Sequence, residues 1–163
     1  ERTPTVLSCD EETNIFLFWS GHGTPGALCW DEDMAGVTGE RLRDVLAELY
    51  ERKSYRKLGV FVETCYSGSV LDKCTGFPGM IFFTAANPDE TSKADVFNTE
   101  LGVWMSNRFT STLLENLTNK SAISLRELYN RLFINTVGSH VMVYNAENYG
   151  NLYNSSMDEF INP

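Results

Sequence analysis

The chain has 163 residues, 42% of them hydrophobic, and its 13 basic and 22 acidic side chains give a formal net charge of −9. This length and composition suit one globular domain and exclude a collagen, a coiled coil or a disordered chain. The excess of acid repels phosphate, which disfavours nucleic acid and anionic lipid as partners. Its apolar runs are far shorter than the ~20 residues that cross a bilayer. Because the sequence starts at Glu1 without an initiator methionine or leader, we expect a processed product or a segment of a longer protein.

Runs of β-forming residues alternate with amphipathic helical segments. Strands are expected at 14–19, 59–62, 80–84 and 140–144. Helices are expected at 39–53, at 106–117 and from Ser124, where Ser124 and Glu127 form a capping box. Strands alternating with helices require crossover connections, so the sequence predicts an α/β fold with a mostly parallel sheet.

The first two strands end on residues that can carry out acyl transfer. The first runs into Ser20-Gly-His-Gly23 and the second into Glu63-Thr-Cys-Tyr-Ser-Gly-Ser69. With one helix between them, the strands should be sheet neighbours, so His22 and Cys65, 43 residues apart, should lie at the same sheet end. A thiol beside an imidazole is the minimum nucleophile and base for attack on a carbonyl. The backbone N–H groups of Gly23 and Cys65 can then hold the developing oxyanion.

Taken singly, these side chains have ordinary interpretations. A lone Cys at a strand end is usually a small buried hydrophobe, and a lone His is usually a satisfied polar residue. The joint position of the two favours a site, because the chain has only two histidines. We interpret the other, His140, as structural, at the opposite end of the sheet or along an edge. No CxxC pair occurs and no metal or cofactor is implied, while a disulfide between two of Cys9, Cys29 and Cys74 stays open.

Five segments also match a known peptidase family. They are Ser20-Gly-His-Gly23, Tyr55-Arg-Lys57, Glu63-Thr-Cys-Tyr-Ser-Gly-Ser69, Thr84-Ala-Ala-Asn-Pro-Asp-Glu-Thr-Ser92 and Ser139-His-Val-Met142. The chain resembles the legumain family of asparaginyl endopeptidases, which are cysteine peptidases with a caspase-like fold. More distantly, it resembles the catalytic subunit of GPI-anchor transamidases. The resemblance implies a caspase-like three-layer sandwich.

The resemblance also implies roles for individual residues. His22 corresponds to the catalytic histidine, Cys65 to the nucleophile and Gly23 to a donor of the oxyanion hole. Glu63 corresponds to the acidic wall of the S1 pocket, and Thr91 and Ser92 are the two small hydroxyl residues that complete it. The implied reaction is hydrolysis of peptide bonds after Asn through a thioester.

The sequence departs from the legumain pattern in three places. Gly21 precedes the histidine where Asp is common, and Val103 stands where the family carries a second S1 acid. The valine puts strict Asn preference in doubt and is reminiscent of the transamidases. The third departure is the strand, helix and strand that open the family's catalytic domain, with an Asn that orients the histidine and an Arg that serves S1. We expect residues 1–163 to be an incomplete, carboxyl-side part of one domain, with an apolar sheet edge beside 15–19 that is exposed or filled by a partner segment.

Three functions are therefore open. The first is a thiol endopeptidase, the second a transamidase or peptide ligase with the same dyad, and the third a catalytically silent scaffold. The expected partners are a peptide or protein substrate and the missing N-terminal segment of the same precursor. Sequons at Asn116, Asn119 and Asn154, together with the resemblance, favour the secretory pathway, an endolysosome or a vacuole.

Overall fold

A four-stranded sheet forms the centre of the computed structural model, which describes residues 8–30, 36–118 and 123–161. In their order across the sheet, the strands are β1 (Asn14–Ser20), β5 (Lys57–Glu63), β6 (Met80–Thr84) and β9 (Met142–Tyr144). The first three are parallel, and β9 is antiparallel to β6. The predicted α/β fold with a mostly parallel sheet is confirmed.

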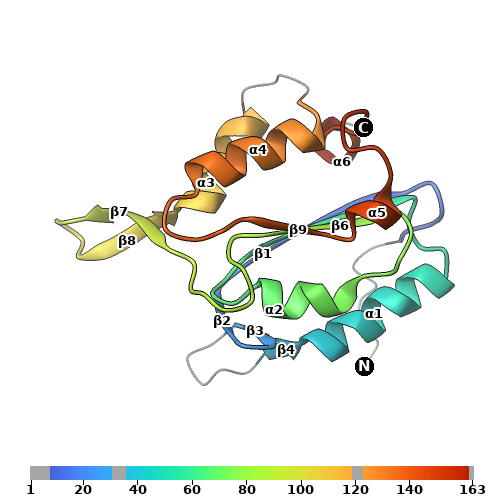
Figure 1. The fold of residues 1–163 in the computed structure, drawn as a ribbon, viewed down its shortest axis with the longest axis horizontal. Coiled ribbons are helices and arrows are strands. Elements are labelled where there is room, and N and C mark those ends of the chain that lie inside the picture. The colour runs from blue at the N-terminus through green and yellow to red at the C-terminus, as the bar shows by residue number, and fades with distance from the viewer. Residues whose placement is uncertain (1–7, 31–35, 119–122, 162–163) are drawn as a thin grey trace.

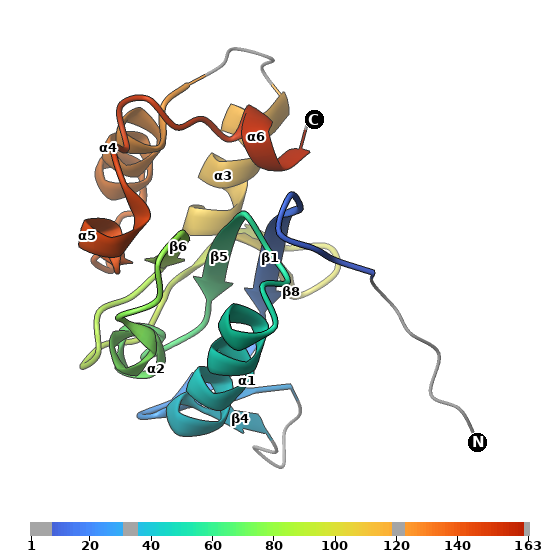
Figure 2. The same ribbon diagram turned by 90° about the vertical axis from the view of Figure 1, so that its right-hand side faces the viewer.

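Helices cover both faces of this sheet and complete a three-layer sandwich (Figures 1 and 2). One layer holds α1 (Gly39–Glu51), the short α2 (Gly68–Leu71) and a 3-10 turn at Asp72–Cys74. The other holds α3 (Arg108–Thr118), α4 (Leu125–Asn135), α5 (Ala146–Tyr149) and α6 (Asp158–Ile161). Alternate strand residues enter the two cores, since a strand has a period of two: Phe61 packs with the α3 and α4 side chains, whereas Val60 and Val62 pack on the α1 and α2 side.

Capping residues mark the first turns of α1 and α4. Thr38 caps α1 by accepting a hydrogen bond from the Arg41 N–H at 3.2 Å, and Ser124 caps α4 by accepting one from the Glu127 N–H at 3.1 Å. The predicted start of α3 is two residues early, because Ser106 and Asn107 pair with the preceding strand instead of joining the helix. The last strand is shorter than predicted, beginning at Met142.

Two small β structures were not predicted. One is a sheet of β2 (His22–Thr24), β3 (Ala27–Cys29) and β4 (Gly36–Thr38), which follows directly after β1. The other is a hairpin of β7 (Ala94–Asn98) and β8 (Val103–Asn107), which projects from the body of the molecule (Figure 1). Strands of three residues are too short to show a periodic pattern, and the hairpin has exposed apolar side chains on a surface arm.

Within the described residues, β1 is an edge strand with β5 as its one neighbour. Leu17 and Phe18 are 38% and 39% exposed there. A groove of about 600 Å³ runs between β1 and α1 and includes Leu17, and one of about 180 Å³ lies between β1 and α3 and includes Phe18. The expected apolar edge is therefore present, with open apolar space on both faces.

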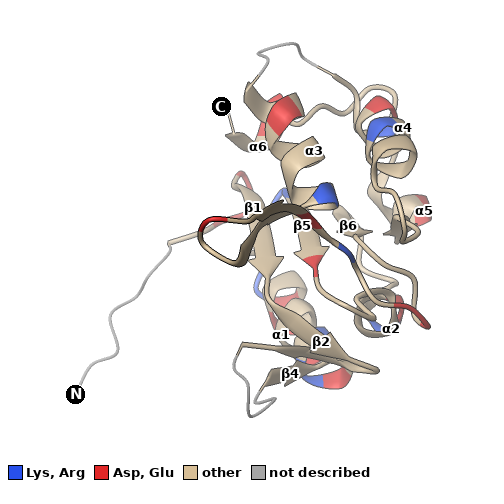
Figure 3. Ribbon diagram, turned by 90° about the vertical axis from the view of Figure 1, so that its left-hand side faces the viewer, with Lys and Arg blue, Asp and Glu red and all other residues tan. Residues whose placement is uncertain are grey.

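Charged side chains of both signs are distributed over several helices and loops (Figure 3). Of the helices in the described ranges, none combines the length and the apolar character that crossing a membrane requires.

Candidate active site

The pairing of β1 with β5 sets the geometry of the site. Each β1 residue lies opposite the residue 43 positions further along the chain, from Asn14 opposite Lys57 to Ser20 opposite Glu63. The Gly21 N–H extends this contact by donating to the Glu63 carbonyl at 3.2 Å. His22 and Cys65 each lie two residues beyond this last pair, so the two residues follow the same end of adjacent strands, as predicted.

Two contacts hold the segment of His22 against the turn of Cys65. A Cβ atom at Gly23 would lie 2.2 Å from the Cys65 carbonyl oxygen and 2.7 Å from Thr64 Oγ1, so only glycine fits there. Further along, the Ser69 hydroxyl accepts from the Gly26 N–H at 2.7 Å and donates to the Tyr66 carbonyl at 2.6 Å. The turn between β2 and β3 is thus tied to the turn that carries Cys65.

The turn after Cys65 has an unusual backbone. Tyr66 has a φ of 56°, a left-handed conformation that a residue with a bulky side chain rarely adopts. Its N–H donates to the Glu90 carbonyl at 2.7 Å, which ties the turn to the loop after β6. Cys65 is half-buried and His22 is exposed, so both side chains are open to a substrate from solvent. Strained backbone of this kind gathers at functional sites.

Glu63 is a buried carboxyl group at the end of β5, only 1% exposed. Thr110 Oγ1 donates to its Oε2 at 3.4 Å, while its Oε1 has no hydrogen-bond partner among the described residues. Burial raises the pKa of Glu63 to about 7, and the polar groups of nearby Ser92 and Thr110 oppose this rise. A buried acceptor without a partner is costly, so Oε1 is a point where a ligand donor would be stabilised.

A cavity of about 340 Å³ lies between the end of β1 and β8. It is lined by Ser20, Trp104, Met105, Ser106, Asn107, Thr110 and Leu114. Thr110 also binds Glu63, and Ser20 lies opposite Glu63 in the sheet, so the cavity adjoins the buried carboxyl group. The sequence analysis did not find these lining residues, because the hairpin and α3 reach the sheet end only through tertiary packing.

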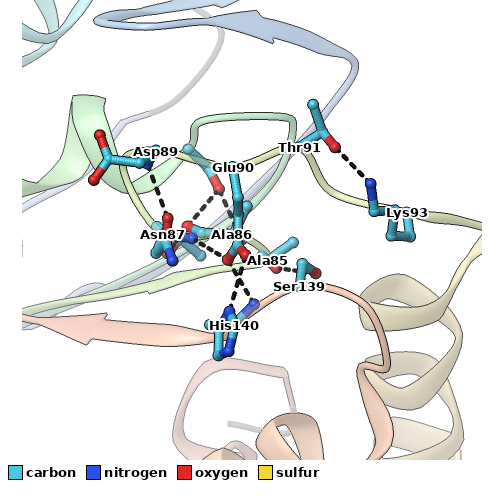
Figure 4. A network of polar contacts seen from close by, with 11 residues as sticks. Ala85, Ala86, Asn87, Asp89, Glu90, Thr91, Lys93, Ser139 and His140 are labelled. Carbon is cyan, nitrogen blue, oxygen red and sulfur yellow. Dashed lines mark hydrogen bonds and ion pairs between the residues drawn. The ribbon is translucent and has the colours of Figure 1, made fainter.

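Of the three other residues predicted for the S1 pocket, only Ser92 lies close to both Glu63 and Cys65. Ser92 belongs to the site, since its hydroxyl acts on Glu63 and its carbonyl oxygen lies 4.0 Å from Cys65 Sγ. Thr91 accepts a hydrogen bond from Lys93 Nζ at 2.7 Å (Figure 4). Val103 lies on the projecting hairpin, opposite Asn98 and 48% exposed, and is not among the residues that line the cavity.

His140 lies at the carboxyl end of the sheet. Its Nδ1 lies 2.9 Å from Glu90 Oε2, beside the loop that follows β6. Of the two positions predicted for His140, the structure shows the edge and not the opposite sheet end, because β9 is the outer strand. Since β9 runs antiparallel to β6, its beginning lies beside the carboxyl end of β6.

The remaining cysteines are free thiols, with Cys29 and Cys74 buried and Cys9 half-buried. Cys74 Sγ lies 3.5 Å from the Val70 carbonyl oxygen, and burial raises the pKa of this thiol to about 12, so it is unreactive. In the ranges that the structure describes, no group of three His, Cys, Asp or Glu side chains is arranged to hold a metal ion.

Comparison with known proteins identifies the family of the chain. The model of the peptidase C13 family matches residues 2–159. The chain belongs to the peptidase C13 family. It is 31% identical to human legumain over 144 residues, which cover 85% of the chain and 32% of legumain. It is 28% identical to the GPI-anchor transamidase of Saccharomyces cerevisiae over 140 residues, 84% of the chain and 34% of that protein. A putative GPI-anchor transamidase of Drosophila melanogaster is 29% identical over 150 residues, 88% of the chain and 41% of that protein.

The C13 chain thus spans about a third of the length of legumain and of the yeast transamidase. The predicted resemblance to the legumain family, and to the transamidases beside it, is confirmed.

Glu63 gives a test of the site through stability. Because burial raises its pKa from 4.5 to about 7, the folded chain keeps a proton that the unfolded chain releases in this interval. The free energy of unfolding should therefore fall as pH rises from about 4.5 to 7. Glu63→Gln removes this fall, so it should be more stable than the wild type at pH 8 by up to about 3 kcal/mol, with little difference at pH 5.

Urea unfolding at the two pH values measures the effect. Glu48→Gln, which changes an exposed carboxylate on α1, is the matched control and should follow the wild type. Equal pH dependence in the wild type and in Glu63→Gln would show that the buried carboxyl group is not protonated in the folded state.

Proposed function

We propose that the chain carries the dyad of a legumain-type cysteine endopeptidase, with Cys65 as nucleophile and His22 as base and acid. The observation that carries the proposal is the β1 and β5 register, which brings both residues to the same sheet end with Gly23 against the Cys65 carbonyl. Membership of the C13 family and the likeness to legumain support it.

In the proposed reaction, His22 takes the proton of Cys65 Sγ, and the thiolate attacks the carbonyl carbon of the scissile peptide bond. The N–H groups of Gly23 and Cys65 hold the oxyanion of the tetrahedral intermediate. The intermediate collapses as His22 gives its proton to the leaving amine, and a thioester remains on Cys65. Water then attacks the thioester with His22 as base, the acid product leaves, and the thiol regains its proton.

We further propose that Glu63 selects the P1 side chain. Its unpartnered Oε1 can accept a hydrogen bond from the carboxamide N–H of Asn, and Ser92 stands beside it. A site with a buried acceptor rejects side chains that leave the acceptor unpaired. We assign Thr91 and Val103 to this S1 pocket from the resemblance alone. Because Val103 stands where the family has an acid, we expect a relaxed preference for Asn at P1.

Peptide cleavage by the full-length protein tests the dyad. Cys65→Ala and His22→Ala should each lower kcat/KM on a peptide with Asn at P1 by roughly 10³-fold or more, since the groups act as a unit. Cys9→Ala removes a half-buried thiol elsewhere and should stay within about twofold of the wild type. Cleavage that survives loss of Cys65 would assign the reaction to another group.

The second hypothesis, a transamidase or peptide ligase, is supported by the similarity to the yeast and Drosophila transamidases and by Val103. It differs only in whether an amine or water resolves the thioester. Adding a primary amine to the cleavage assay and identifying the products by mass spectrometry distinguishes the hydrolase from the transamidase, because a hydrolase releases mainly the free acid. A Cys65 thiol that reacts no faster than free cysteine would favour the third reading, a silent scaffold.

The P1 assignment can be tested across a panel of peptides that differ at P1. At pH 8, where Glu63 is ionised, Glu63→Gln should lower the preference for Asn by about 10-fold, because it replaces a pure acceptor with an amide. Val103→Asp adds an acidic group to the proposed pocket and should sharpen the preference for Asn. Glu48→Gln on exposed α1 is the control, and a P1 preference unchanged in both pocket variants would remove Glu63 and Val103 from S1.

We also propose that residues 1–163 are the carboxyl-side part of one peptidase domain. In this proposal, the N-terminal segment of the same precursor adds a strand to the free edge of β1. Support comes from the grooves on both faces of that edge, which would receive alternate side chains of an added strand. An unpaired apolar edge is otherwise prone to aggregation.

Co-expression of the tagged chain with the upstream segment as a separate polypeptide tests this pairing. The two should purify together. Phe18→Lys should weaken their association by at least about 10-fold, because it places a charge in the apolar groove beside α3. Glu51→Lys, at the exposed end of α1 and outside both grooves, is the control. Separate elution of the two polypeptides, or equal binding by Phe18→Lys, would contradict the proposal.

For localisation we propose the secretory pathway, an endolysosome or a vacuole. Of the three sequons, Asn154 is exposed and suited to carry a glycan. Asn116 is less suited, because it lies in α3 with its side chain bonded to Arg131 and to the Thr112 carbonyl. Asn119 lies outside the described residues.

A further inference from the structure

We propose that Glu90 is a positioning residue of this site, and that its contacts with His140 hold the turn of Cys65 in its working shape. The proposal rests on the proposed function. Glu90 lies on the loop that follows β6, between Ala86 and Ser92, and this loop is hydrogen-bonded to the Cys65 turn. Neither Glu90 nor His140 is among the residues that line the cavity beside Glu63.

The Glu90 carboxylate collects three donors (Figure 4). Its Oε1 accepts from the Asn87 N–H at 2.9 Å and from the His140 N–H at 2.6 Å. Its Oε2 lies 2.9 Å from His140 Nδ1, which donates in the tautomer that carries its proton there. Burial acts to raise the pKa of Glu90, but the hydrogen bonds from Asn87 and His140 outweigh it and lower the pKa below its usual value. The folded chain therefore holds Glu90 as a carboxylate.

The backbone of Glu90 links its side-chain contacts to the turn that carries the nucleophile. Its carbonyl oxygen accepts the Tyr66 N–H at 2.7 Å, directly after Cys65. Tyr66 has a φ of 56°, and such a conformation persists only where surrounding contacts fix it. Two residues beyond Glu90, Ser92 approaches Cys65 Sγ through its carbonyl and Glu63 through its hydroxyl. A shift of Glu90 would thus move both the thiol and the pocket wall.

A second contact supports the same loop from the same side. Ser139, the neighbour of His140, donates through its hydroxyl to the Ala85 carbonyl at 2.7 Å. The segment before β9 therefore holds the loop at two points, one at Ala85 and one at Glu90. His140 is 68% and Glu90 22% exposed at the side chain, and an ion pair as open as this contributes little to stability. Its loss should appear in the geometry of the site more than in folding.

The test compares Glu90→Ala, Glu90→Gln, His140→Ala and the Ala/Ala double variant in the full-length protein. Two rates are measured: kcat/KM on the P1 Asn peptide, and alkylation of Cys65 by iodoacetamide, located by mass spectrometry. Glu90→Ala should lower both by roughly 10- to 100-fold, since small displacements of reacting groups are costly. Glu90→Gln should recover most of each rate, because its amide oxygen still accepts the two backbone N–H groups.

His140→Ala should lower both rates less than Glu90→Ala, and the double variant should be no slower than Glu90→Ala alone, as expected for one shared link. Asp89→Asn is the matched control: it removes a neighbouring, exposed carboxylate and should behave as the wild type. Thermal unfolding of each variant separates these effects from loss of fold. If Glu90→Ala does not fold, His140→Ala carries the test, because it removes the ring donor alone: rates equal to the wild type in His140→Ala would then overturn the proposal.

Wild-type alkylation and cleavage rates in Glu90→Ala would overturn the proposal. Additive losses in the double variant would overturn the link between Glu90 and His140. The proposed function fails separately, if the wild type cleaves no peptide or if Cys65→Ala still cleaves. In that case the alkylation rates alone decide whether Glu90 positions the Cys65 turn.

Discussion

The parallel pairing of β1 with β5 is the contact on which the whole site depends. Its register puts Ser20 opposite Glu63, and His22 and Cys65 each follow two residues later, so the proposed dyad and the buried carboxyl group lie at one sheet end. A slip of one residue would exchange the two faces of β1 and separate these groups. The apolar side chains of both cores fix the register, because Phe16 packs on the α3 side whereas Ile15 and Trp19 pack on the α1 side.

The features of this structure that are unfavourable for folding lie beside the proposed reactive groups. Glu63 is buried with one oxygen unpartnered, and three residues later Tyr66 holds a left-handed backbone. Neither feature stabilises the fold, and both are held by the loop after β6 through Glu90 and Ser92. Stability sacrificed at a few adjacent positions is typical of a site shaped for a ligand. In the proposal above, the contact between Glu90 and His140 positions this loop.

The sequence predicted those parts whose signals are local. The runs before His22 and Cys65 predicted strands, α1 shows its amphipathic period, and Ser124 marks the start of α4. Burial on both faces was correct for β5 but wrong for β1, because β1 lies at the sheet edge. The position of His140 required the direction of β9, which no local pattern encodes. Thr110 and Trp104 reach the cavity through tertiary packing, so their part in it was not predictable from spacing. Val103 has a role by resemblance alone, and the hairpin that carries it was not foreseen.

Labelling of the full-length protein with an electrophilic peptide that carries Asn at P1, followed by mapping of all four cysteines, tests the proposed dyad most directly. The register predicts modification of Cys65 ahead of Cys9, Cys29 and Cys74, with the rate lost in His22→Ala. Equal labelling of Cys9 and Cys65, or a rate that His22→Ala leaves unchanged, would contradict a catalytic pair at this sheet end.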